Sequence, residues 1–279
     1  MAMAELSEAV RLLVRMPLLW IPGIVGGIFA AVLWLIFSFS GTFFAGRILV
    51  ICGLVLLFFI AGMLCLIKND SGDIRAMIRE GGNYYFRVLL PQLVIIFMIL
   101  LVFVLVLLTL TLVGTTPDPA LIVFLSFGVM LPSIILTFFS DTAAVFENRK
   151  VFDSIQRSIE LVSMNISQVI AFFVTCAVVG FGILFGLMVV WEAFLYDKLE
   201  PVTHYSEVQL QAFTPDQLLA MIGTQGVWIT AGMLFIAGLV LIPVLFSYKA
   251  CFFRKMAGKT VVIQQTTGEY DSKGRWYKY

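Results

Sequence analysis

The sequence predicts an all-α polytopic membrane protein with six transmembrane helices. Hydrophobic residues make up 61% of the chain and charged residues 13%, about half of the roughly 25% found in soluble domains. The mean hydropathy is +1.03. A water-soluble globule of 279 residues could not bury this much apolar surface, so lipid must be the solvent for most side chains. The composition therefore excludes a soluble enzyme, a disordered chain and a protein with a nucleic-acid partner.

Six apolar stretches reach the length of about 20 residues that a helix needs to cross the hydrocarbon core. Backbone polar groups in lipid must be satisfied within the segment, which favours helices, and the two-residue alternation typical of a membrane β-barrel is absent from the sequence. The first stretch follows Arg11 and Arg15 but is too long for the core of a signal peptide, so we expect it to be retained. The predicted spans are Leu18–Phe39, Ile48–Ile67, Val88–Val113, Ala120–Ser140, Gln168–Trp191 and Val227–Ala250.

Basic residues are distributed unequally between the two sides of the predicted membrane domain. The N-terminus, the second and fourth loops and the C-terminal tail carry sixteen of the eighteen lysines and arginines, and the opposite side carries only Arg47 and Lys198. Cytoplasmic loops are enriched in basic residues. We therefore predict a multi-pass protein of the cell (plasma) membrane with both termini in the cytoplasm.

An internal repeat is visible in three basic-side stretches, Val10–Arg15, Ile74–Arg79 and Ile155–Glu160. Each places a β-branched residue at positions i and i+4, and each of these is followed by a polar residue. The pattern predicts three parallel repeats of an interfacial helix plus a transmembrane hairpin, over residues 5–67, 71–146 and 151–250. The alternative is that any basic juxtamembrane helix shows this pattern, because long basic side chains extend along apolar surfaces to reach water.

Small residues indicate which spans approach one another closely. Gly23 and Gly27 form a GxxxG pair on the first span, and Gly182 and Gly186 form another on the fifth. Such pairs let helix backbones come into contact. The third span is almost wholly large aliphatic residues between Val94 and Leu108 and lacks glycine there, so we expect it to face lipid.

Residues 1–257 form the predicted transmembrane domain, and residues 258–279 form a cytoplasmic tail. Thr260–Ile263 has β propensity, and the following residues predict a small hairpin that turns at Asp271–Gly274. The tail would dock on anionic headgroups or on a protein partner; the alternative is that it is disordered.

The loop between spans five and six, about residues 192–226, is acidic. Thr214, Pro215 and Asp216 predict the start of a short helix that runs through Met221 and rests Leu218, Leu219 and Ile222 on the membrane. The loop is interpreted either as a solvated connection or as a cation or partner site that includes His204.

Polar residues near the basic ends of the spans are the candidate functional residues, because polar groups inside a membrane are energetically costly. We predict that they line one cytoplasm-facing polar vestibule. The alternative is that the amides bind neighbouring helices and the carboxylates lie in headgroup water. The candidate residues are Gln92, Asp141, Glu147, Gln168, Asn165 and Arg87.

Patterns typical of catalysis are absent from the sequence. His204 is the single histidine, so an HExxH zinc site cannot form, and neither a GxSxG elbow nor a Walker loop occurs. The four cysteines include no CxxC pair and lie in or beside apolar runs, as packing residues do. We therefore expect a protein without enzymatic activity, cofactor or metal.

One stretch, Val145–Asn165, resembles a segment of a poorly characterised family of prokaryotic, including archaeal, six-span membrane proteins. That family is related to the membrane domain attached to some glycerophosphodiester phosphodiesterases. The matching positions are an acid after the fourth span and a short helix with an Arg-Ser pair and a terminal asparagine, here Glu147, Arg157, Ser158, Leu161 and Asn165. The resemblance implies a membrane-embedded module for lipid handling or envelope upkeep. No phosphodiesterase domain accompanies it, so that activity is not implied.

These observations together predict a non-catalytic membrane protein for envelope maintenance or the passage of lipid or small molecules, with membrane lipids as its partners. The alternative is an accessory subunit that docks a protein partner through its tail or through the loop between spans five and six.

Overall fold

The structure, a computed structural model, is almost entirely helical. It describes residues 2–112, 118–206, 209, 213–266, 269–270 and 276–277. Within these residues, six helices are long and apolar enough to cross a membrane, which confirms the predicted number of spans and the all-α class. They cover Pro17–Ser40, Thr42–Asn69, Ile74–Leu112, Ala120–Phe146, Ile166–Phe194 and Pro215–Gly258.

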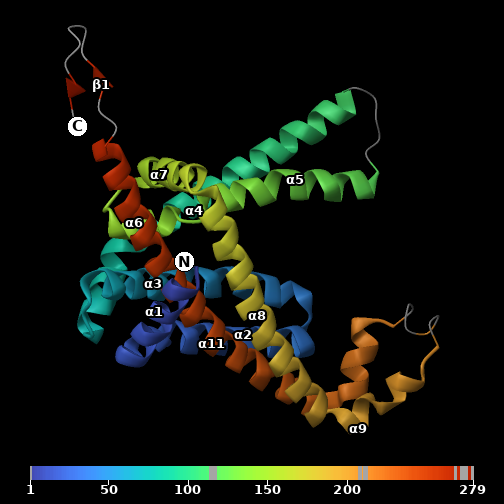
Figure 1. Cartoon of the computed structure of the whole chain (residues 1–279). Coiled ribbons are helices and arrows are strands. Elements are labelled where there is room, and N and C mark those ends of the chain that lie inside the picture. The colour runs from blue at the N-terminus through green and yellow to red at the C-terminus, as the bar shows by residue number, and fades with distance from the viewer. Residues whose placement is uncertain are drawn as a thin grey trace.

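The described elements follow one another along the chain with short connections (Figure 1). Successive long helices form three hairpins, α2 with α3, α4 with α5, and α8 with α11. The α4–α5 hairpin extends away from the other two, whereas α2 and α11 pack against each other (Figure 1). The elements are α1 (Ala2–Arg15), η1 (Pro17–Trp20), α2 (Ile21–Ser40), α3 (Thr42–Asn69), α4 (Ile74–Leu112), α5 (Pro119–Thr137), α6 (Ser140–Phe146), α7 (Val151–Met164), α8 (Ile166–Phe194), α9 (Tyr196–Leu199), η2 (Glu200–His204), α11 (Pro215–Thr266), β1 (Glu269–Tyr270) and β2 (Trp276–Tyr277).

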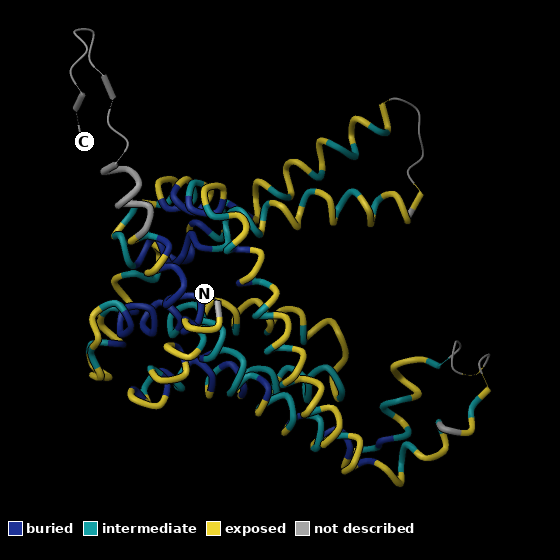
Figure 2. The backbone as a smooth tube through the Cα atoms, in the orientation of Figure 1, coloured by how far each residue is buried: buried dark blue, intermediate teal, exposed yellow. Residues whose placement is uncertain are grey.

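Burial is concentrated at one end of the molecule, which we call the basic side because α1, α7 and the ends of α3, α4 and α11 bring their lysines and arginines there. Most buried residues gather at this end, and the far halves of the spans are exposed (Figure 2). Ion pairs join elements that are distant in sequence: Arg254 with Glu8, and Lys255 with Glu5, connect α11 to α1. Apolar surface that remains exposed on the spans is suited to lipid contact.

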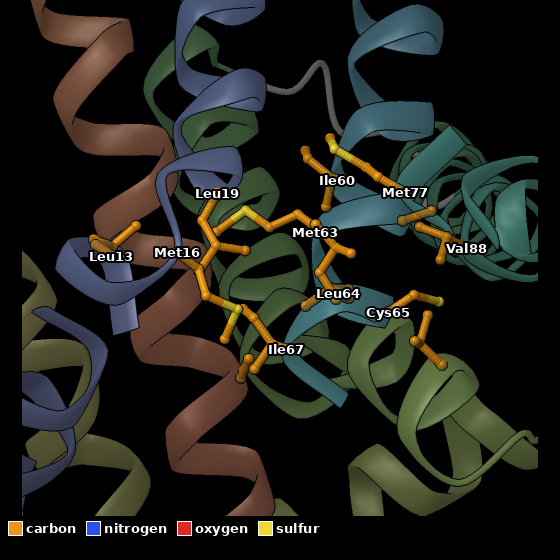
Figure 3. Packing of buried hydrophobic residues seen from close by; sticks show 14 residues of the cluster. Leu13, Met16, Leu19, Ile60, Met63, Leu64, Cys65, Ile67, Met77 and Val88 are labelled. Atoms are coloured by element: carbon orange, nitrogen blue, oxygen red, sulfur yellow. The ribbon is translucent and has the colours of Figure 1, made fainter. Parts of the chain in front are cut away.

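A cluster of aliphatic side chains and methionines connects the first two spans to the start of α4. Met16 and Leu19 pack against Met63 and Leu64 of α3, and Met77 closes the cluster from α4 (Figure 3). Unbranched methionine side chains fill irregular gaps between helices. This packing fixes the basic-side ends of α3 and α4 relative to each other.

Glycines allow α2 and α11 to touch, as predicted for the first GxxxG pair. A Cβ atom added to Gly27 would collide with the backbone oxygen of Phe235, and one added to Gly238 would lie 2.7 Å from the Gly27 Cα. The second pair behaves differently, because no atom lies within 4 Å of a Cβ added to Gly182 or Gly186. These two glycines therefore face away from the described helices.

The segment before the last span starts a helix where the sequence predicts it. α11 begins at Pro215, and the Thr214 hydroxyl accepts a hydrogen bond from the Gln217 N–H (3.4 Å). Gly223, with φ of 62°, interrupts the helix. Ile222, which is 1% exposed, packs inside the protein with Leu195 and Val227, so the prediction that it rests on the membrane is wrong. Leu218 and Leu219 are partly buried against the same cluster.

The first residues of the tail differ from the predicted conformation. Residues 260–263 continue α11, which ends at Thr266, so the strand expected there is not formed. Glu269 pairs with Tyr277 and Tyr270 with Trp276 in antiparallel register. The predicted turn at 271–274 lies outside the described residues. The three proposed repeats also differ in form, because α1 and α7 are separate helices while residues 74–79 continue directly into α4.

Candidate functional site

A groove of about 1010 Å³ lies between α3, α4 and α5. Its walls are almost wholly aliphatic and aromatic, and its few polar groups include a charged pair at the basic side. The lining residues are Val50, Gly53, Leu54, Leu56, Leu57, Ile60, Leu89, Gln92, Leu93, Ile95, Ile96, Ile99, Leu100, Phe103, Ser126, Val129, Met130, Ile134, Thr137, Phe138, Asp141, Phe246 and Lys249.

The groove runs along the spans rather than across them. On α4 its lining extends from Leu89 to Phe103, a length of about 21 Å at 1.5 Å per residue. The hydrocarbon core of a bilayer is about 30 Å thick. The groove therefore follows most of the apolar depth of a membrane and reaches its polar end at Asp141 of α6 and Lys249 of α11.

Asp141 and Lys249 form a buried ion pair at this end. The Lys249 Nζ lies 2.7 Å from Oδ1 and 2.8 Å from Oδ2 of Asp141. The two residues are 4% and 5% exposed. The Thr142 N–H and hydroxyl also donate to Asp141 Oδ1, at 2.6 and 3.1 Å. The Lys249 ammonium lies 4.2 Å from the centre of the Phe138 ring, a cation–π contact that further stabilises the charge.

The energetics of the pair point to a role beyond folding. Removing two charges from water carries a large desolvation cost, and apolar residues of similar volume often replace a buried pair without loss of stability. Charged side chains within membrane spans are therefore treated as functional candidates, together with their partners. Asp141 and Lys249 meet this description because both are buried and both line the groove.

Two hydroxyls add weak polarity to the groove wall on α5. The Ser126 hydroxyl donates to the Ile122 carbonyl and the Thr137 hydroxyl to the Ser133 carbonyl, each at 2.6 Å. Each hydroxyl oxygen has lone pairs that can still accept a hydrogen bond. The groove thus offers scattered acceptors along an apolar wall and a full charge pair at one end.

The six candidate residues separate into several locations. Gln92 and Asp141 line the groove. Arg87 is exposed and donates to Asn148 in a different hollow. Glu147 accepts from Arg149 and Arg157 beside α7. The remaining two, Asn165 and Gln168, lie at the junction of α7 and α8, where the Asn165 Nδ2 donates to the Leu161 carbonyl at 3.0 Å. Of the six residues, the groove therefore brings together Gln92 and Asp141.

Residues of α7 form hydrogen bonds and an ion pair with the residues on either side of Asp141. The Ser158 hydroxyl donates to the Leu136 carbonyl at 2.8 Å and accepts the Phe139 N–H at 3.0 Å, where α5 gives way to α6. The Arg157 Nε lies 3.1 Å from Oε1 of Glu147 at the end of α6. These bonds attach α7 to both ends of α6 and thereby orient Asp141 toward Lys249.

Lys249 is the functional candidate that sequence reasoning missed. Its position near the end of the last span places it among the sixteen lysines and arginines of the predicted cytoplasmic side. A signal was present, because Lys249 is the one charged residue in the apolar run Val227–Phe253. A charge placed several residues inside such a run requires a buried partner, which in this chain is Asp141.

Metal binding has no support among the described residues, where no group of three or more His, Cys, Asp or Glu side chains could hold an ion. His204 is exposed at the end of η2. The acidic loop therefore gives no defined cation site within the part of the chain that the structure describes.

Comparison with known proteins gives no match: no family model fits the chain, and neither a curated protein nor a solved structure is similar to it.

Proposed function

We propose that the protein is a non-catalytic membrane protein that binds a membrane lipid in the groove between α3, α4 and α5. The observation that carries this proposal is the combination of a long apolar groove with a buried ion pair at one end. A lipid has the same two parts, an acyl chain and a polar headgroup, in the same order along the membrane normal.

The size of the groove supports a lipid-sized ligand. Ligand pockets typically measure about 300–1,000 Å³ and combine apolar walls with a few polar groups that fix orientation. The groove of about 1010 Å³ lies at the upper end of that range. An acyl chain along α4 would contact residues such as Leu93 and Ile96, and the headgroup would lie near Lys249.

Binding of this kind supports a role in envelope maintenance or lipid passage in the plasma membrane. In this proposal the basic side faces the cytoplasm, together with both termini, as the distribution of lysine and arginine favours. The proposal includes an origin of the three hairpins from one repeated unit. It also includes docking of the tail, residues 258–279, on the cytoplasmic surface of the membrane. The resemblance of residues 145–165 to a family of six-span membrane proteins fits a lipid-handling role.

The test is a variant that fills the groove without disturbing the fold. Gly53 lines the groove, and no atom lies within 4 Å of a Cβ added there. Gly53→Phe should therefore fold normally and occupy the space that an acyl chain needs. We expect native mass spectrometry of the purified protein to show one retained lipid in the wild type and a clearly lower occupancy in the variant, because the added ring fills part of the groove.

The matched control is Gly182→Phe on α8, where an added Cβ likewise meets no atom within 4 Å but the position is outside the groove. This variant should retain lipid as the wild type does. Equal retention by Gly53→Phe would contradict lipid binding in the groove. Copurification of a stoichiometric protein that covers the groove would instead favour the accessory-subunit alternative.

A further inference from the structure

A second hollow lies at the basic side, outside the groove, between α4 and the start of α7 with the residues just before it. Its volume is about 680 Å³. It combines basic, apolar and aromatic side chains, and none of its residues lines the groove. The lining residues are Phe86, Arg87, Leu90, Asn148, Lys150, Val151, Phe152 and Asp153.

The hollow lies at the depth of lipid headgroups. On α4 the residues from Val88 to Leu112 include no charge, and as a helix they extend about 36 Å, which exceeds the thickness of about 30 Å of the hydrocarbon core. Arg87 directly precedes this charge-free run. The guanidinium is thus placed just outside the hydrocarbon, where the phosphate groups of lipids are found.

Arg87 is held in place by neighbouring side chains. Its Nη1 donates to the Asn148 Oδ1, and its guanidinium lies 5.4 Å from the centre of the Tyr84 ring. The Tyr84 hydroxyl donates to the same Asn148 oxygen at 3.3 Å. A guanidinium has five N–H donors, and its planar shape matches two phosphate oxygens. The remaining donors are therefore oriented in advance for an anion.

The charge in the hollow favours an anion. Arg87 and Lys150 supply two positive charges, and Asp153 is the single acid among the lining residues. The nearby Glu147 carboxylate is already engaged by Arg149 and Arg157, at 2.6 and 3.1 Å. It therefore does not cancel the charge of the hollow, which is positive overall.

Exposed apolar side chains indicate that the anion belongs to a lipid. Phe86 and Phe152 are 63% and 73% exposed, and Leu90 is 42% exposed. A free phosphate ion would gain nothing from these neighbours, whereas acyl chains would cover them. We propose that the hollow binds the phosphate of an anionic membrane phospholipid through Arg87 and Lys150, with its chains against Phe86, Leu90 and Phe152.

The test measures binding of a short-chain phosphatidic acid to the full-length protein in neutral detergent, followed by native mass spectrometry. Near a membrane surface, each lysine or arginine changes the affinity for anionic lipid about fivefold. The R87Q/K150Q variant should therefore bind about 25-fold more weakly. The charge-retaining R87K/K150R variant should bind more tightly than R87Q/K150Q but more weakly than the wild type, because lysine lacks the planar pair of donors that matches two phosphate oxygens. Asn148 has a φ of 55°, so glycine can replace it without backbone strain. The N148G variant lacks the side-chain oxygen that holds Arg87 and should therefore bind phosphatidic acid more weakly.

Three controls distinguish a specific phospholipid site in the hollow from a general charge effect, from binding of free phosphate and from binding in the groove. R11Q/R75Q removes two exposed basic-side charges outside the hollow and should leave binding unchanged; an equal loss would show a general charge effect and overturn the proposal. Inorganic phosphate alone should bind far more weakly than the lipid, and equal binding would overturn the lipid assignment. Gly53→Phe should not affect this site, so failure of the groove proposal and failure of this one are distinguishable.

Discussion

The contact between α2 and α11 and the groove beside α4 and α5 show two outcomes for apolar helices in one molecule. At the first, Gly27 and Gly238 bring the backbones so close that no Cβ fits between them. At the second, large side chains such as Leu93, Ile96 and Phe103 line an open space. Both regions are strongly apolar, so hydrophobicity does not distinguish them.

The difference follows from the nature of the solvent. Lipid tails are as apolar as leucine, so helices in a bilayer gain little from hiding leucine from their surroundings, and close packing decides which helices associate. Glycine allows that packing in the α2–α11 contact. Where large residues face one another and no small residue allows the helices to approach, contact with lipid is as favourable as contact with another helix. The open groove is therefore the expected place for a bound lipid.

The largest expected effect concerns the charged end of the groove. Lys249→Met would leave the Asp141 carboxylate buried without its cation, which should reduce the free energy of unfolding by about 3–5 kcal/mol. Unfolding in mixed detergent micelles would measure the loss. A double variant, Lys249→Met with Asp141→Leu, should recover most of the stability, because apolar residues replace buried pairs well.

That double variant also separates stability from binding. If the pair recognises a headgroup, the double variant should be folded and yet retain less lipid than the wild type. Full lipid retention by the double variant would show that the pair is only structural.

A smaller effect is expected at the contact between α2 and α11. Gly27→Leu would force a side chain against the backbone of Phe235, and overpacking of this kind costs about 1–3 kcal/mol or more. Gly186→Leu, in the equivalent motif on α8, should change stability by less than about 0.5 kcal/mol. Thermal unfolding of the two variants in the same detergent would compare them. If Gly186→Leu lowered the stability as much as Gly27→Leu does, Gly186 would have to pack closely against another helix, which would contradict the structure.

A further effect, comparable to that of Gly27→Leu, is expected at the junction of α5 and α6 at the base of the groove. Ser158→Ala would leave the buried Phe139 N–H without its acceptor and the Leu136 carbonyl without its donor. The expected cost is about 1–3 kcal/mol, with a change in the angle between α5 and α6. Spin-label distances between α5 and α11 would detect this change, and unchanged distances would contradict the role assigned to Ser158.

Part of the site was accessible from sequence because polar residues in apolar spans are conspicuous. Asp141 and Gln92 were found in this way, and both line the groove. Glu147 and Arg87 were grouped with them by their depth along the spans, but depth does not specify the direction in which a side chain points. Glu147 is paired with Arg157 of α7, and Arg87 of α4 is bonded to Asn148, so neither residue lines the groove.

Length and apolarity along the chain were sufficient to determine the six spans, because a bilayer accepts only helices of about 20 apolar residues or closed barrels. The start of α11 at Pro215 was also set locally, by a threonine and a proline in sequence. Only the tertiary structure decided that Lys249 pairs with Asp141, 108 residues away, and that one GxxxG motif makes a contact while the other does not. These outcomes depend on which helix faces which, and helix pairing in lipid rests on shape complementarity between surfaces that are far apart in sequence.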